Sequence, residues 1–214
     1  MIGKKLLVGL AHLDRDEIHR NVEKVIDETK PRKVGLEVPR DFNNGMSIYF
    51  FDKVENYCIQ KGIKIFPLVE QTAYEELNSI FTAINLIEKR LDADKSKAKY
   101  LELKRDLDYH SNNSRTFPGT ILTLISSIKS IEGAFDMVNN YSSEQIQERW
   151  TRDLRRYEQS MVDSIKRSKP DVSFMGRFHL HPVNTELCKR GLEGFNTLDL
   201  TQTNKVPFLS RRLF

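Results

Sequence analysis

The spacing of apolar residues predicts alternating strands and helices at both ends of the chain. Near the start, the short apolar runs at residues 6–11, 34–38 and 63–69 predict three buried strands. Two helices are expected between them: residues 47–60 form one, and an apolar face at helical spacing marks the other, formed by Ile18, Val22, Val25 and Ile26. Near the end, residues 172–175 and 195–200 predict strands that flank a short helix at 184–190. This order predicts an α/β fold with a mostly parallel central sheet wrapped by helices.

The middle of the chain changes to a purely helical period. One apolar stripe consists of Leu77, Ile80, Phe81, Ile84, Ile87 and Leu91, and a second of Ile121, Leu124, Ile125, Ile128, Ile131 and Phe135. Ser142 and Gln145 have the spacing of a capping box, which predicts a third long helix after them. We therefore expect one domain over residues 1–214, with residues 71–168 as a helical insertion between the two α/β parts.

Composition and charge exclude several classes of protein. The 214 residues are 39% hydrophobic and 30% charged, and the net charge of +4 is made of interspersed signs, so we expect no nucleic-acid partner. Cys58 and Cys188 form no CxxC pair, which suits a reducing compartment. No apolar run approaches the roughly 18 residues of a membrane span. We expect a cytoplasmic protein without a membrane span, and residues 74–108 leave homo-oligomerisation open.

One short motif occurs twice, each time after a predicted strand. It is Gly-x-x-His, ending at His12 in the first copy and at His179 in the second. Ten glycines and five histidines among 214 residues would give this spacing about 0.2 times by chance. A glycine at the end of a strand lets the chain turn or another group approach closely. The repetition favours a functional role for both histidines over two unrelated structural ones.

Two glutamates extend this pattern to other strand ends. Glu37 closes the second predicted strand and Glu70 follows the third. The carboxyl ends of parallel strands meet at one edge of a sheet, where ligands collect. Two imidazoles and one or two carboxylates form a ligand set for a divalent metal ion such as zinc, manganese or cobalt, and a carboxylate outside that set could act as general base.

Other interpretations of these residues stay open. Glu37 could pair with Arg40, and Glu70 could cap the helix that follows it. His181 competes with His179 as the second histidine, because Pro182 favours an extended backbone there. His110, placed in a polar loop at residues 110–118, is a weaker candidate, and His19 is expected at the solvated surface.

The two motifs resemble those of the TraB/PrgY pheromone-shutdown proteins. The first motif of that family reads Gly-Thr-Ala-His, and the segment that ends at His12 is similar to it. A later strand of the family carries a Glu with an Arg three residues on, which Glu37 and Arg40 match here. The segment 174–179 is similar to their second Gly-x-x-His. The wider group includes the Tiki metalloproteases and, more remotely, the erythromycin-esterase and ChaN proteins. Leu10 stands where the esterase and ChaN branches have Glu.

The resemblance implies a metal-dependent hydrolase, with peptide-bond cleavage in the Tiki branch. It carries His12, Glu37, Arg40 and His179 into the site, and either Arg155 or Arg156 would match a further arginine of the family. Together with the strand-end pattern, we expect His12, His179 and Glu37 to hold the metal, with Glu37 as a ligand or the base. We expect Glu70 to be a second acid and Arg40 to clamp the substrate. A peptide or another small molecule would be the substrate. The alternatives are a non-catalytic binding protein on the same scaffold and a metal-free His/Glu hydrolase.

Overall fold

The computed structural model describes residues 5–10, 16–39, 49–88, 91–112, 118–192 and 194–200. Contacts divide the chain into two compact units. The first, here called the α/β unit, consists of Met1–Arg40, Ser47–Val69 and Glu158–Phe214. The second, here called the helical unit, consists of Asp41–Met46 and Glu70–Tyr157. The single-domain organisation stays a prediction.

The α/β unit is built on a five-stranded parallel sheet. Its strands are β1 (Lys5–Leu10), β2 (Lys33–Pro39), β3 (Lys64–Val69), β4 (Val172–Gly176) and β5 (Phe195–Asp199). They lie in the order β3-β2-β4-β1-β5, and every pair is parallel. The predicted fold class is therefore confirmed. Strand β4 comes late in the sequence but lies between β1 and β2 in the sheet, so it pairs the C-terminal part of the chain with the N-terminal part.

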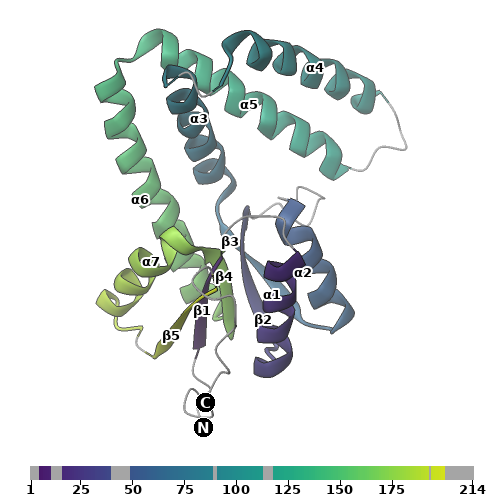
Figure 1. The fold of residues 1–214 in the computed structure, drawn as a ribbon, viewed down its shortest axis with the longest axis vertical. Helices are drawn as coiled ribbons and strands as arrows, with labels where there is room; N and C mark the ends of the chain where they lie inside the picture. Colours follow the sequence, from purple (N-terminus) through teal and green to yellow (C-terminus); the bar gives the residue numbers. More distant parts are fainter. Residues whose placement is uncertain are drawn as a thin grey trace. The chain divides into compact units, whose positions relative to one another are not determined.

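Helices cover both faces of this sheet. The connections through α1 (Asp16–Thr29) and α2 (Tyr49–Gln60) step from β1 to β2 to β3, whereas α7 (Arg177–Lys189) steps the opposite way, from β4 to β5. Right-handed crossovers in opposite directions place their helices on opposite faces. Figure 1 shows α1 and α2 on one side of the sheet and α7 on the other.

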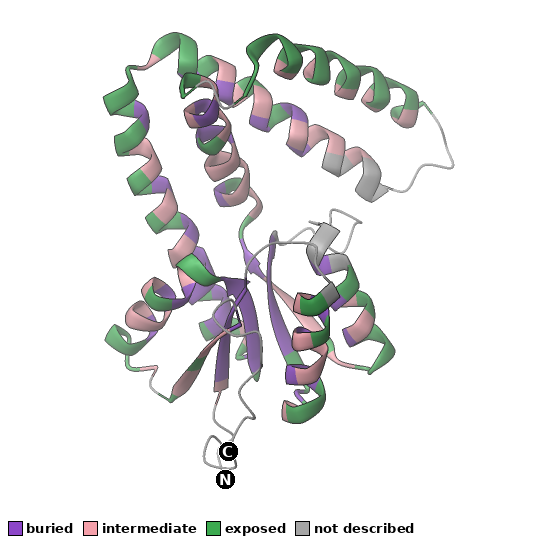
Figure 2. Ribbon diagram, in the orientation of Figure 1, coloured by how far each residue is buried: buried purple, intermediate pink, exposed green. Residues whose placement is uncertain are grey.

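The central strands form the core of the unit. Every residue of β4 is buried, as is β1 from Leu6 to Leu10 (Figure 2). Uninterrupted apolar runs are what strands covered on both faces require, which is why the sequence pattern located them within about two residues. At the amino end, the Asp171 carboxylate accepts hydrogen bonds from the backbone N–H groups of Arg32 and Lys33, at 2.8 and 3.0 Å. These bonds tie the start of β2 to the start of β4.

Gly9, in the first Gly-x-x-His motif, permits a close approach between β1 and α7. A Cβ atom on it would lie 3.1 Å from Leu180 Cδ2 and 3.2 Å from Arg177 Cα. Any larger residue would therefore displace the first turn of α7. This is the close approach that a glycine at a strand end was expected to allow.

The helical unit packs through both large and small residues. It contains α3 (Gln71–Ile87), α4 (Ala93–Ser111), α5 (Pro118–Asn140) and the first part of α6 (Ser143–Ser168). A Cβ atom on Gly133 of α5 would lie only 2.8 Å from Ser79 Oγ of α3. The buried hydrophobic core of this unit contains Ile80, Ala83, Ala134, Met137 and Ile146. The predicted capping box is confirmed, because the Ser142 N–H donates to Gln145 Oε1 and the Gln145 N–H to Ser142 Oγ.

The two predicted apolar stripes are only partly buried. Ile80 and Ile128 are core residues, but Phe81 is 57% exposed, Leu91 42% and Ile87 37%. Small residues of α3 and α5 are buried as well, among them Ser79, Ala83 and Ala134. Helix α4 has no buried residue at all (Figure 2). None of the helices in the described ranges has the length and apolarity needed to cross a membrane.

Candidate functional site

The site begins where β2 and β4 run side by side. Leu36 of β2 lies opposite Phe174 of β4, which brings the carboxyl ends of the two strands together. Gly176 ends β4 and is the N-cap residue of α7. Its backbone N–H donates a hydrogen bond to Glu37 Oε2, and Glu37 itself is only 3% exposed. The glycine of the second motif therefore holds a buried carboxylate of the neighbouring strand.

His179 lies in the first turn of α7, next to this carboxylate. Its Nε2 atom is 3.6 Å from Glu37 Oε1, and its side chain is 14% exposed. His179 comes three positions after Gly176, so the helix that begins after the glycine turns the ring back toward Glu37. The structure thus brings together two of the residues that the sequence predicted for one site.

Glu158 is a third member of this cluster that sequence reasoning missed. It belongs to α6, and its Oε1 lies 3.1 Å from His179 Nδ1. No motif marks it, and it precedes the histidine by 21 positions. One signal was present: Glu158 shares the helical spacing of Met161 and Ile165, both buried, so a carboxylate stands on an apolar face of α6. A charge in such a position needs a partner.

The imidazole of His179 therefore lies between two carboxylates. Burial alone would lower the pKa of the ring, but the hydrogen bond with Glu158 and the negative charges of Glu37 and Glu158 outweigh it, so the pKa is raised. The cluster consequently favours a positive charge at this point. A proton on the ring supplies that charge, and so does a metal ion bound by Nε2 and Glu37.

The pair of His179 and Glu37 fits part of a metal site. Ligand atoms of a tetrahedral zinc ion, each about 2.0–2.1 Å from it, lie about 3.4 Å apart, close to the 3.6 Å between Nε2 and Oε1. Imidazole and carboxylate are also the donor types that zinc, manganese and cobalt accept. Within the described ranges, however, no group of three or more His, Cys, Asp or Glu is placed to hold an ion. A third protein ligand would have to come from outside them.

The other predicted site residues are distributed differently. His12 and Arg40 lie outside the described residues. Glu70 is the N-cap residue of α3 and belongs to the helical unit; its carboxylate makes no capping hydrogen bond, so the side-chain cap considered for it is not formed. Its role as a second acid stays a prediction.

Three histidines differ from their expected surroundings. His181 is exposed and lies inside α7, because the helix starts at Arg177, seven residues before the predicted one, and accommodates Pro182. The prediction of an extended backbone at His181 was therefore wrong. His110 lies in the last turn of α4, within the helical unit, and not in a loop. His19, expected at the surface, is buried at 6% exposure.

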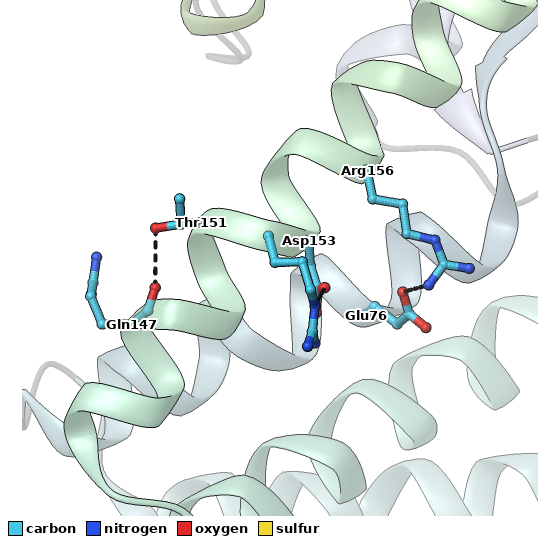
Figure 3. Close-up of polar contacts among 6 residues, drawn as sticks. Glu76, Gln147, Thr151, Asp153 and Arg156 are labelled. Carbon is cyan, nitrogen blue, oxygen red and sulfur yellow. Dashed lines mark hydrogen bonds and ion pairs between the residues drawn. The ribbon is translucent and has the colours of Figure 1, made fainter.

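Arg155 and Arg156, the candidates for the further family arginine, are both exposed. Arg156 Nη1 forms an ion pair with Glu76 Oε2 of α3 at 2.8 Å (Figure 3). Both partners belong to the helical unit. The described contacts of Arg156 therefore lie in this unit and not at Glu37 or His179.

Comparisons with known proteins add little to this geometry. No protein-family model matches the chain, and no curated protein matches its sequence. One solved structure, of an erythromycin esterase mutant in its open conformation, is similar to this chain, with 10% identity and a TM-score of 0.41. The similar region covers 92% of this chain and 70% of the esterase chain. A similarity at this level does not establish a shared activity. The relation to the TraB/PrgY proteins stays an expectation based on the two motifs.

Proposed function

We propose that this chain is a metal-dependent hydrolase with its site at the carboxyl edge of the sheet. The observation that supports it is the approach of His179 Nε2 to within 3.6 Å of Glu37 Oε1, at the ends of two neighbouring parallel strands. Such an edge is the usual ligand position in open α/β sheets. The second Gly-x-x-His motif meets Glu37 there through both its glycine and its histidine.

Each residue of the proposed site has a distinct task. His179 and Glu37 would hold a divalent metal ion, and His12, two positions after β1, would be the third ligand. A metal ion in such a site lowers the pKa of its water and polarises a carbonyl group. The Gly176 N–H fixes Glu37 Oε2, so that Oε1 is the oxygen directed at the histidine. Arg40 would clamp a substrate oxygen. A peptide or amide bond is the substrate we propose.

A metal-free His/Glu hydrolase is the second candidate, and one observation favours it. The raised pKa of His179, which lies between Glu37 and Glu158, lets the ring hold a proton where the first proposal has a metal ion. A protonated imidazole next to a carboxylate can act as general acid, and Glu37 as general base. The substrate need not change between the two proposals.

Turnover with and without metal distinguishes these functions. The protein, purified without chelator or His-tag, is loaded with zinc, manganese or cobalt and assayed against fluorogenic peptides, anilides and esters. We expect hydrolysis that chelator abolishes and that Glu37→Gln and His179→Ala remove. Glu186→Gln, whose carboxylate pairs with Arg190 at 3.2 Å, should retain it. Chelator-resistant turnover would replace the first proposal with the second. Absence of turnover in every loaded form would contradict both and leave a binding protein.

A further inference from the structure

Glu158 contacts His179 on the ring nitrogen that faces away from Glu37. Its Oε1 is 3.1 Å from Nδ1, while Nε2 is the nitrogen near Glu37. The Glu158 side chain is 17% exposed and the histidine 14%, so bulk water competes weakly for this bond. An ionised carboxylate only accepts hydrogen bonds, so Nδ1 must carry the proton that it shares with Glu158.

This hydrogen bond determines which nitrogen of the neutral ring keeps its lone pair. With the proton on Nδ1, the lone pair is on Nε2 and points toward the side of Glu37. In metal sites, the ligating histidine usually donates its other N–H to a carboxylate or carbonyl group, and this bond fixes both its tautomer and its ring orientation. The arrangement of Glu158, His179 and Glu37 has that form.

We propose that Glu158 is the positioning residue of the site: it fixes the Nδ1–H tautomer and the orientation of His179, which presents Nε2 to the ion held with Glu37. This inference rests on the proposed function for its metal, but the tautomer itself does not need one. Glu158 is the first residue of the third segment of the α/β unit, so it belongs to the same unit as its partners. It therefore acts through His179 and is not expected to touch the substrate.

The tautomer can be measured directly. Nitrogen-15 NMR of metal-free protein with labelled histidine, at alkaline pH where the ring is neutral, distinguishes a protonated Nδ1 from a protonated Nε2. We expect His179 in the wild type to show the Nδ1–H form. Glu158→Ala should shift it toward the Nε2–H form that is favoured in solution, and Glu158→Gln, whose amide oxygen still accepts a hydrogen bond, should keep most of the Nδ1–H form.

Metal affinity provides the second measurement. Titration with zinc alone should show about 10-fold or more weaker binding in Glu158→Ala than in the wild type, with a smaller loss in Glu158→Gln. Asp163→Asn is the matched control: this carboxylate lies on α6 five residues later, but its partner is Arg190 at 2.6 Å. It should change neither the tautomer nor the affinity.

The outcomes separate this inference from the proposed function. An Nε2–H ring in the wild type, or the same tautomer in Glu158→Ala as in the wild type, would overturn the role of Glu158. Zinc that fails to bind the wild type would overturn the metallohydrolase, while a tautomer that responds to Glu158→Ala would still support the positioning role.

Discussion

The two units of this chain bury their residues in different ways. In the α/β unit the core contains large side chains such as Phe174, Leu7, Leu36 and Met161, each fully buried. In the helical unit Ile80 and Ile146 are also fully buried, but a large aromatic residue, Phe81, is 57% exposed. Here α5 approaches α3 so closely that a Cβ atom on Gly133 would lie 2.8 Å from Ser79 Oγ. The buried charged cluster at Glu37 lies in the first unit. A dense core around a site keeps its side chains in one geometry, which chemistry requires.

The largest expected effect tests this contrast in packing. Phe174→Ala, in the central strand β4, should lower the free energy of unfolding by about 3–5 kcal/mol, because it leaves a cavity in a core that cannot collapse. Leu101→Ala, at a position of α4 that is 52% exposed, should change it by about 0.5 kcal/mol or less. Urea denaturation measures both. Similar losses for the two variants would contradict the contrast.

A somewhat smaller effect is expected where the core meets the site. Gly9→Val should cost about 1–3 kcal/mol, because its side chain would press on Arg177 Cα and Leu180 Cδ2. It should also displace the first turn of α7 and alter the NMR signals of His179.

The control for this variant is Gly62→Ala. Gly62 has a φ of +69° and open space around its Cβ position, so alanine there should cost about 1 kcal/mol through backbone strain alone. The His179 signals should not change. If both variants perturb His179 equally, the contact at Gly9 does not position the histidine.

Burial in the α/β unit should also appear in the pH dependence of stability. Desolvation raises the pKa of the Cys58 thiol to about 12, and the charge of Glu55 adds to this. The folded state therefore keeps a proton that the unfolded chain loses above about pH 9, so stability is intact below that pH and falls between about 9 and 12. The expected slope is about 1.4 kcal/mol per pH unit at most.

The contribution of Cys58 to the pH dependence is isolated by comparing the unfolding free energies of cysteine variants and the wild type between pH 9 and 12. Cys58→Ala should remove that part of the alkaline slope, whereas Cys188→Ala, at an exposed position, should leave it unchanged. An identical slope in the Cys58 variant and the wild type would show that the thiol is accessible to water.

The smallest effect is expected at the surface of the helical unit. The Arg156–Glu76 ion pair joins side chains that are 58% and 43% exposed, so a double-mutant cycle should give a coupling of about 0.2–1 kcal/mol. Its dependence on salt should be strong. A coupling well above this range would indicate that the pair is part of a site and not a surface contact.

The sequence predicted the strands of the α/β unit well, because strands buried on both faces need continuous apolar runs. It could not give the strand order, since the insertion of β4 between β1 and β2 depends on pairing between residues more than 130 positions apart. The apolar stripes of the helical unit were less informative. Small residues such as Gly133 allow two helices to approach closely, and a pattern of hydrophobic residues alone does not reveal such positions.

The site shows the same limit. Glu37 and His179 were predicted together because Glu37 closes a predicted strand and His179 follows another, and parallel strands bring their carboxyl ends to one edge. Glu158 comes from a helix, and its only mark was a charge on an apolar face. The early start of α7 was missed because a proline favours an extended backbone at the residue before it. The helix nevertheless contains Pro182, at its sixth residue.

We propose that Glu37 and His179 hold a metal ion, and elemental analysis measures that ion without an activity assay. Wild-type protein, purified without chelator or His-tag and reloaded with zinc, manganese or cobalt, is compared with Glu37→Gln, His179→Ala, His12→Ala and the control Glu186→Gln. We predict close to one equivalent of metal in the wild type and the control, and little in the other three. A wild type without metal under every loading, or equal metal in all five proteins, would contradict the claim.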